Sequence, residues 1–154
     1  MARPIKLRKI EKIPAAPYFV PSEEGIEGVE VSVLLVEEIE AIRLKDLEGL
    51  EQAECAERME VSRPTFQRIL LSARKKIADS LINGMAIHID GGNYTRYICN
   101  VMCDDCNTQW KESFENLQLI KEGKYACPTC GSIKIDCLKK CRGKFCNKNC
   151  WKHK

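Results

Sequence analysis

Histidine is scarce in this sequence, and long apolar runs are absent from it. The chain has two histidines among 154 residues, and it shows neither a nucleophile–base pair nor a phosphate-binding glycine loop, so we expect no enzymatic activity. No window approaches the roughly 20 apolar residues of a membrane span, and charges stand at the start of the chain where a signal peptide needs an apolar run. These absences predict a cytoplasmic protein without a membrane partner.

Cysteine is nearly missing from the first two thirds of the chain and abundant after it. Nine of the ten cysteines lie at or after Cys99. In a reducing cytosol, closely spaced cysteines are typically metal ligands rather than disulfides. Charge is uneven as well, since residues 21–60 carry a net charge of −10 and residues 137–154 carry +7. This distribution favours several small modules over one core, and it suits polyanion binding by chosen faces.

The changes in composition predict an α+β fold class assembled from separate modules. The first module is a basic N-terminal arm with an acidic lead-in, and the second is an all-α helix-turn-helix domain. A small β zinc ribbon follows, and a short basic, cysteine-rich helical tail ends the chain. In order, the four modules cover residues 1–34, 35–85, 86–136 and 137–154.

The pattern of apolar residues predicts three helices in the second module. A supporting helix starts near Val36, a second helix covers about residues 51–59, and a turn at residues 60–62 leads into a third helix that begins at Arg63. Ser62 is a good N-cap, and a proline in the first turn loses no hydrogen bond, because the amides there have no intrahelical partner. The predicted buried face of the third helix consists of Phe66, Ile69, Leu70, Ala73, Ile77 and Leu81.

The opposite face of the third helix is basic and rich in hydrogen-bond donors. Arginine and glutamine read guanine and adenine edges in the major groove, and basic side chains further along can bind phosphate. We predict base reading by Arg63, Thr65, Gln67 and Arg68. The predicted contacts with the DNA backbone come from Ser62, Arg74, Lys75 and Lys76. A flexible arm in the minor groove would add Arg3, Lys6, Arg8 and Lys9.

A resemblance to a known family covers about residues 1–92. It rests on LVEEIEAIRLKDLEGL from Leu35 to Leu50, on AECAERMEVSRPTFQRILLSARKKIADSLING, and on the closing Ile89-Asp90-Gly91-Gly92. These segments resemble uncharacterised protein family 0251, a prokaryotic family of predicted DNA-binding proteins whose helix-turn-helix is similar to sigma-70 region 4. The resemblance implies transcriptional or other DNA binding. Glu60 departs from the family, which usually has glycine there; if the backbone needs a positive φ, glutamate costs roughly 1 kcal/mol.

Two CxxC motifs predict a metal site in the third module. The first is formed by Cys103 and Cys106, and Cys127 and Cys130 follow 20 residues later. Such turns let paired sulfurs approach one ion, and four cysteines leave no open position for catalysis. The alternation from residue 108 to 114 predicts a strand, so the module resembles a rubredoxin-like zinc ribbon with a structural Zn²⁺, with iron or empty thiols as alternatives. Before it, residues 86–90 and 94–101 are predicted as two strands joined by a turn.

The tail carries four more cysteines, and they predict a second metal site. Its x3 spacings place each pair of cysteines on one side of a helical turn. Zn²⁺, an iron–sulfur cluster and a pair of regulatory disulfides all stay open, beside a basic tail with unconnected thiols. The four residues are Cys137, Cys141, Cys146 and Cys150. Outside both quartets, Cys55 is predicted to be a small buried hydrophobe and Cys99 to pack within a strand.

The sequence as a whole predicts a transcriptional regulator that binds double-stranded DNA and holds two zinc ions. One alternative is a metal or redox sensor, with the tail cluster as input and the helix-turn-helix as output. A second alternative is a protein-interaction adaptor that docks onto RNA polymerase through the acidic block. A homodimer is compatible with each of the three.

Overall fold

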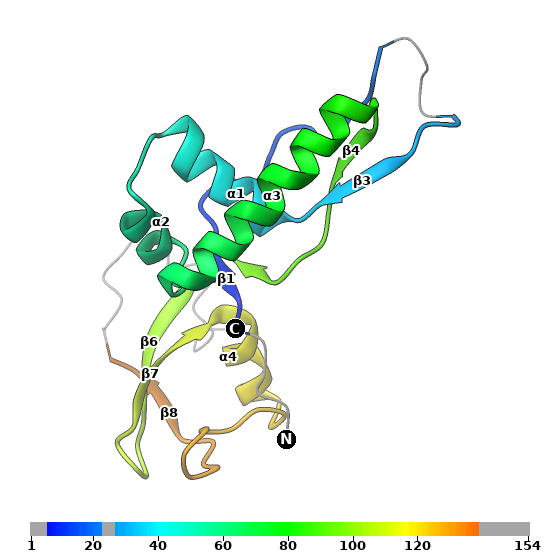
Figure 1. The fold of residues 1–154 in the computed structure, drawn as a ribbon. Coiled ribbons are helices and arrows are strands. Elements are labelled where there is room, and N and C mark those ends of the chain that lie inside the picture. The colour runs from blue at the N-terminus through cyan, green and yellow to red at the C-terminus, as the bar shows by residue number, and fades with distance from the viewer. Residues whose placement is uncertain (1–5, 23–26, 139–154) are drawn as a thin grey trace. The chain divides into compact units, whose positions relative to one another are not determined.

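Three α-helices form where the apolar periodicity predicts them. In the computed structural model, which describes residues 6–22 and 27–138, α1 spans Val36–Ile42, α2 spans Gln52–Arg58 and α3 spans Arg63–Asn83 (Figure 1). α1 continues into a π-helical turn, η1, at Arg43–Leu47. The chain divides into two units, unit 1 at Met1–Arg96 and unit 2 at Tyr97–Lys154, and each is described by itself. Within the described ranges, no helix is long and apolar enough to cross a membrane.

The helices of unit 1 pack around one apolar cluster. Its buried members are Ala41, Leu44, Cys55, Ala56, Met59, Phe66 and Leu70. Cys55 is fully buried, as predicted, and burial raises the pKa of its thiol. The prediction that Leu81 is buried on α3 is wrong, because this side chain is 74% exposed. Among the described residues, the apolar clusters that include α3 extend only as far as Ile77; Ser80 is still buried, but Leu81 and Ile82 lie on the exposed side of the last turn.

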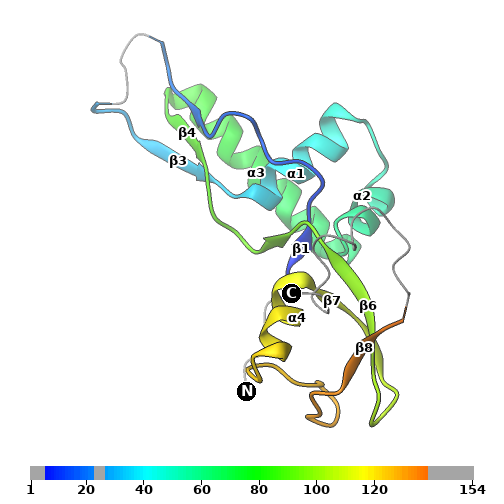
Figure 2. The same cartoon turned by 180° about the vertical axis from the view of Figure 1, so that it is seen from behind.

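A three-stranded sheet lies alongside α3 and is built from distant segments. β2 at Tyr18–Phe19 and β3 at Val31–Leu34 flank β4 at Ala86–Ile89, with β3 parallel and β2 antiparallel to β4. Figure 2 shows β3 and β4 running beside the helix. The buried side chains of Leu34, Ile89 and Ala73 join one apolar cluster, which fixes the sheet against α3. β4 therefore belongs to unit 1, although the sequence placed residues 86–96 with the ribbon.

The N-terminal segment is part of the fold of unit 1. β1 at Arg8–Lys9 pairs in parallel with β5 at Tyr94–Thr95. The amide of Lys9 donates a 2.8 Å hydrogen bond to the carbonyl of Met59, at the end of α2, and Ile10 is buried. The prediction of a flexible arm is therefore wrong for Arg8 and Lys9, because their backbone is held in a strand. Arg3 lies outside the described residues.

A buried carboxylate accounts for the glycine at position 92, in the loop before β5. The Glu37 side chain accepts hydrogen bonds from the Asn93 amide at 3.1 and 3.2 Å, and it is only 4% exposed. Gly92 has a φ of 104°, and a Cβ added there would overlap this carboxylate. The carbonyl of Gly91 accepts a hydrogen bond from the Val36 amide. The loop is thus closed onto the start of α1, and residue 92 must be glycine.

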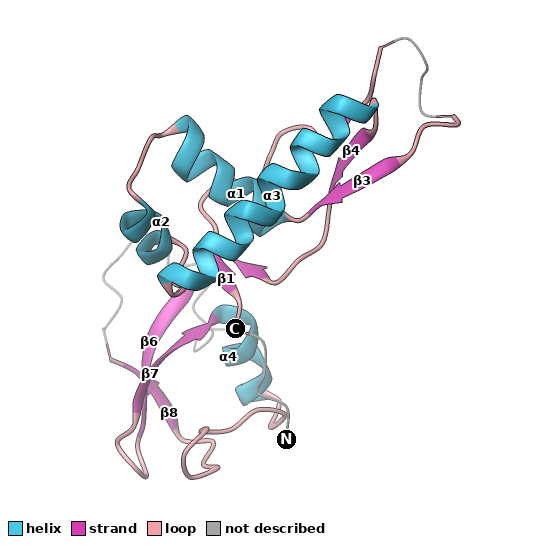
Figure 3. Cartoon of the chain, in the orientation of Figure 1, coloured by secondary structure: helices cyan, strands magenta, loops and turns pink. Residues whose placement is uncertain are grey.

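In its described residues, 97–138, unit 2 forms a small antiparallel sheet and a helix (Figure 3). β6 at Ile98–Cys103 lies between β7 at Gln109–Ser113 and β8 at Ile135–Cys137, and α4 spans Phe114–Lys121. The predicted strand at residues 108–114 is confirmed as β7. The predicted strand at residues 94–101 is instead divided between β5 and β6, which lie in different units. The buried core consists of Val101, Cys103, Leu117, Ile120, Cys127 and Ile135.

Candidate functional site

The connection between α2 and α3 is a tight turn with one residue in a left-handed conformation. Glu60 has a φ of 55°. Its amide donates to the carbonyl of Glu57, and the amide of Val61 donates to the carbonyl of Ala56, so the turn closes directly onto α2. An L-residue in this conformation costs roughly 1–2 kcal/mol. The sequence identified the position by its departure from glycine, and the backbone has the positive φ that glycine would favour.

The start of α3 is capped as predicted. The Ser62 hydroxyl accepts a 3.3 Å hydrogen bond from the amide of Thr65. Because Phe66 faces the core, Arg63 and Arg68 are left exposed. The helix therefore begins at a fixed point and presents two arginines to solvent within its first two turns.

Some polar side chains at the start of α3 already form hydrogen bonds within unit 1, whereas others do not. The amide nitrogen of Gln67 donates to Gln52 on α2 at 2.9 Å, and a guanidinium nitrogen of Arg68 lies 3.4 Å from the hydroxyl of Thr65. The side chain of Arg63 makes no hydrogen bond or ion pair with another described residue. Arg63 and Arg68 are thus the side chains most readily available to a ligand at this end of the helix.

Two of the predicted phosphate contacts are occupied inside unit 1. Arg74 donates to both carboxylate oxygens of Asp46, at 3.1 and 2.5 Å, and these hydrogen bonds lower the pKa of Asp46. The amine of Lys76 lies 2.8 Å from the buried carboxylate of Glu38. Lys75 is exposed and has no such partner in the described part of the chain. The sequence gives no sign of these pairings, because each joins α3 to a residue about 30 or more positions earlier.

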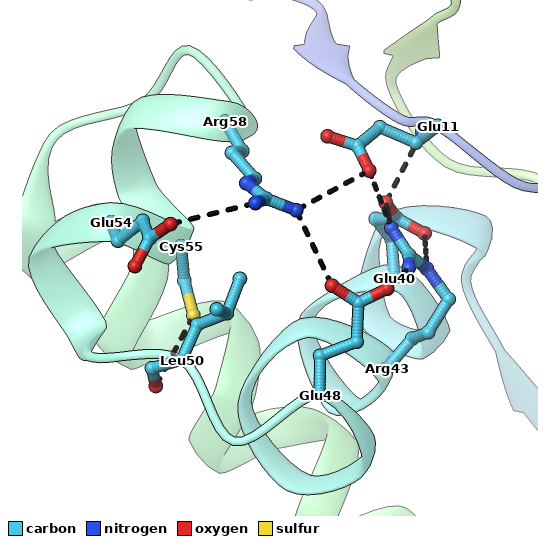
Figure 4. Close-up of polar contacts among 8 residues, drawn as sticks. All are labelled: Glu11, Glu40, Arg43, Glu48, Leu50, Glu54, Cys55 and Arg58. Carbon is cyan, nitrogen blue, oxygen red and sulfur yellow. Dashed lines mark hydrogen bonds and ion pairs between the residues drawn. The ribbon is translucent and has the colours of Figure 1, made fainter.

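Part of the acidic block of the sequence is engaged in internal contacts. Arg43, at the start of η1, donates to the nearly inaccessible carboxylate of Glu40 at 2.6 and 2.9 Å, and these hydrogen bonds raise the pKa of the arginine. Figure 4 shows how this pair extends into a network that links the N-terminal segment, η1 and α2. Its other charged members are Glu11, Glu48, Glu54 and Arg58. These carboxylates hold unit 1 together rather than forming a free acidic face.

Four cysteines of unit 2 converge on one point. Cys103 ends β6, Cys106 lies in the loop after it, and Cys127 and Cys130 lie in the loop before β8. Their sulfur atoms all lie within 4.8 Å of one another. This cluster confirms that the two CxxC motifs form one group of thiols that could hold a metal ion.

The two cysteine loops have the same backbone pattern. The amide of Cys103 donates to the carbonyl of Thr108, and the amide of Cys127 donates to the carbonyl of Ser132, five residues on in each loop. The fourth residue after the first cysteine has a positive φ in both loops, 56° at Asn107 and 74° at Gly131. Two turns of identical geometry therefore present their sulfurs to a shared centre.

The sulfur positions fit a tetrahedral ion. The Sγ atoms of Cys103 and Cys130 are 3.5 Å apart, and those of Cys106 and Cys127 are 3.6 Å apart. Zn–S bonds of about 2.3 Å in a tetrahedron require sulfurs roughly 3.8 Å apart. The Thr108 hydroxyl lies 3.2 Å from Sγ of Cys106, and its hydrogen bond, with one from the Thr108 backbone, lowers the pKa of that thiol to about 6. This favours the thiolate, which is the form that binds metal.

A buried glutamate organises the core beside this cluster. The carboxylate of Glu112, on β7, accepts three hydrogen bonds from side chains. They come from the indole of Trp110 at 3.0 Å, the hydroxyl of Tyr125 at 2.7 Å and the side-chain amide of Asn116 at 2.8 Å. These contacts join β7, α4 and the chain that leads to Cys127. Sequence reasoning missed this role, because a glutamate in an alternating strand is normally a solvated residue.

Of the predicted second metal site, only Cys137 lies among the described residues, and it is not one of the four clustered cysteines. Cys137 lies in β8, and it packs with Cys99 against the core of unit 2. Cys141, Cys146 and Cys150 lie outside the described residues. The convergence of four cysteines is therefore a property of the first quartet, and the second quartet stays a prediction from the sequence.

Comparison with known proteins places both units in one group of relatives. Residues 1–97 match the family described as "Protein of unknown function DUF134". A UPF0251 protein of Clostridium novyi (strain NT) is 48% identical over 152 residues, which cover 99% of this chain and 98% of the relative. The UPF0251 protein of Clostridium tetani is 47% identical over 153 residues, 99% of each chain, and that of Clostridium beijerinckii 45% over 150 residues, 97% and 96%. No solved structure matches the chain.

Proposed function

The chain belongs to the UPF0251 (DUF134) family, and we propose that it is a DNA-binding transcriptional regulator. In this proposal, α2, the turn at residues 59–62 and α3 act as a helix-turn-helix similar to sigma-70 region 4. The observation that carries the proposal is the exposed, capped and basic start of α3, directly after a tight turn. We propose no catalytic role for the protein.

The side chains at the start of α3 suit the edges of base pairs. The major groove is about 12 Å wide and admits one α-helix, and arginine pairs with guanine while glutamine pairs with adenine. Arg63, Gln67 and Arg68 are exposed there, and we assign base reading to them. A helix N-terminus attracts anions, but Pro64 has no N–H and the amide of Thr65 already donates to the Ser62 hydroxyl, so neither residue has a free amide for a phosphate. Thr65 contributes less to base reading than predicted, because its hydroxyl is engaged within the helix.

The role of unit 2 in this proposal is that of a structural zinc ribbon. Four thiolates saturate the coordination of Zn²⁺, so the ion would bind no substrate. A unit with so small a core gains stability from metal binding, which is worth on the order of 10 kcal/mol in small zinc peptides. The paired cysteine loops and the sulfur spacing support zinc at this site.

The test is a selection of bound duplexes from a random DNA pool with the full chain. The Arg68→Ala variant is expected to relax the preference at one base position and to lose about 1–3 kcal/mol of discrimination there. Arg96→Ala is the matched control, because it removes an exposed arginine outside α3. Enrichment of no sequence above the starting pool, or identical profiles for the parent and Arg68→Ala, would reject the proposed reading helix.

The adaptor alternative has less support from the structure. Glu37, Glu38 and Glu40 of the acidic block are buried and hydrogen-bonded, which leaves a basic partner only the exposed carboxylates of the block, such as Glu27, Glu30, Glu51 and Glu57. The sensor alternative depends on the tail quartet, most of which lies outside the described residues. DNA binding by α3 is therefore the function that the geometry supports best.

A further inference from the structure

The exposed side of α3 changes from basic to apolar along the helix. Side chains three or four positions apart share a face of an α-helix. Beyond residues 63–68, this rule puts one apolar stripe opposite the buried face, consisting of Leu71, Ala78 and Ile82, with Lys75 at its edge. Leu71 is 71% exposed and Ile82 is 84% exposed. The second half of α3 therefore offers solvent an apolar stripe in place of a polar one.

The length of α3 separates this stripe from the proposed DNA contact. A helix of 21 residues is about 31 Å long, whereas the major groove is about 12 Å wide. The first turns are sufficient to reach the bases, so the apolar stripe is not needed there. Single exposed apolar residues are common on protein surfaces, whereas Leu71 and Ile82 lie about three turns apart on one face with Ala78 between them, and apolar residues grouped on one face mark a contact surface.

The charges beside the stripe are complementary to those of an identical, antiparallel helix. Lys75 and Asp79 are four residues apart and lie on the same flank of the stripe. In two antiparallel helices related by a two-fold axis, the same flank of both helices comes together, so Lys75 of each copy would lie near Asp79 of the other. Asp79 accepts a hydrogen bond from the Asn83 amide at 2.6 Å, which leaves its carboxylate further acceptor capacity.

We propose that this stripe is the contact surface between two copies of the chain. The two α3 helices pack in antiparallel orientation, with the two-fold axis level with residues 76 and 77. Leu71 of one copy then covers Ile82 of the other, since the two residues are equally far from the axis. Ala78, near the middle, allows the helices to approach closely. The Lys75–Asp79 pairs form twice on one flank, so Lys75 leaves the predicted set of phosphate contacts.

Resting on the proposed function, the dimer sets the distance between its two DNA-reading segments. The centre of residues 63–68 lies eleven helical rises from the axis, so the two reading segments are about 33 Å apart along the helices. The dimer would therefore bear two reading segments, one at each end of the paired helices, and would bind a palindromic site better than a single half-site.

The experiment is sedimentation equilibrium on the full chain without DNA. The parent protein is expected to dimerise, and Ile82→Glu is expected to raise the dissociation constant at least about tenfold, because it buries a charge in the apolar stripe. Leu47→Glu is the matched control, since Leu47 is 80% exposed and lies on η1, outside the proposed stripe. This control is expected to dimerise like the parent.

A charge exchange tests the register of the two helices. Lys75→Glu and Asp79→Lys are each expected to weaken the dimer roughly five- to tenfold, and the double variant is expected to recover the affinity of the parent to within about twofold. A chain that stays monomeric up to about 100 µM, an Ile82→Glu variant that dimerises normally, or a double variant no tighter than the single ones would overturn the proposal. Since no DNA is present, failure of base reading by Arg68 leaves this result unaffected.

Discussion

Replacing Glu60 by glycine is expected to stabilise unit 1. The residue has a φ of 55°, a conformation that costs an L-residue roughly 1–2 kcal/mol and glycine almost nothing. Glycine adds backbone entropy to the unfolded chain, which offsets about 0.5–1 kcal/mol of that gain. The net increase in the free energy of unfolding is therefore about 0.5–1 kcal/mol. In a unit of this size, such a change raises the melting temperature by roughly 3–6 °C.

Far-UV circular dichroism is the appropriate assay for this variant. Both tryptophans, Trp110 and Trp151, lie beyond unit 1, so tryptophan fluorescence would report on the wrong part of the chain. Helical signal reports mainly on unit 1, because α4 contributes only eight residues. Urea unfolding followed at 222 nm gives the free energy by linear extrapolation. The measurement compares the parent, Glu60→Gly and Glu60→Ala.

Glu60→Ala separates the backbone from the carboxylate. Alanine removes the charge but keeps a Cβ in the left-handed conformation, so it is expected to show none of the gain. Glu60→Asn should fall between alanine and glycine, because asparagine tolerates this conformation better than most residues. If alanine stabilises the unit as much as glycine does, the left-handed turn is not the origin of the effect and the reasoning fails.

Three further predictions follow from contacts in the two units. Gly92→Ala is expected to lower the free energy of unfolding of unit 1 by about 2–4 kcal/mol in urea, because it adds backbone strain and displaces a hydrogen-bonded carboxylate. The control Gly91→Ala has open space around the added Cβ, so it should lower this free energy by only about 1 kcal/mol. Replacing Cys103 by serine, or adding a strong chelator, should release zinc and unfold unit 2. Tryptophan fluorescence should report this unfolding while the circular dichroism signal of unit 1 at 222 nm persists. Simultaneous loss of both signals would contradict the division into units. Asp46→Asn should free Arg74 and steepen the salt dependence of DNA affinity by about one counterion, and an unchanged slope would show that this arginine does not reach phosphate.

Local patterns in the sequence were sufficient to predict the parts of the fold that depend on neighbouring residues. Ser62 was identified as a cap because its hydroxyl acts within one turn, and α3 begins at Arg63 as predicted. The two CxxC motifs predicted the cysteine cluster, since each pair is fixed by its own short loop. Leu81 was misassigned because periodicity shows which residues share a face, but not where the covering elements end.

Pairing between distant segments could not be predicted from such patterns. β1 pairs with β5 and β3 pairs with β4 across more than 50 residues. Parallel pairs lack the short turn that makes a hairpin recognisable, so residues 86–90 were joined instead to the next strand in the sequence. The role of Asp46 was equally hidden, because its partner lies 28 residues away on another helix.

The single hydrogen bond from Lys9 to Met59 limits how the helices can be separated from the rest of the chain. Met59 is the residue just before the left-handed turn, so the orientation of α3 depends on a strand that the sequence places 50 positions upstream. A fragment reduced to residues 36–83 would keep every helix of unit 1 and lose this restraint, along with the apolar cover supplied by Ile10. For grafting onto another scaffold, the smallest portable piece is therefore all of unit 1 with its N-terminal strand.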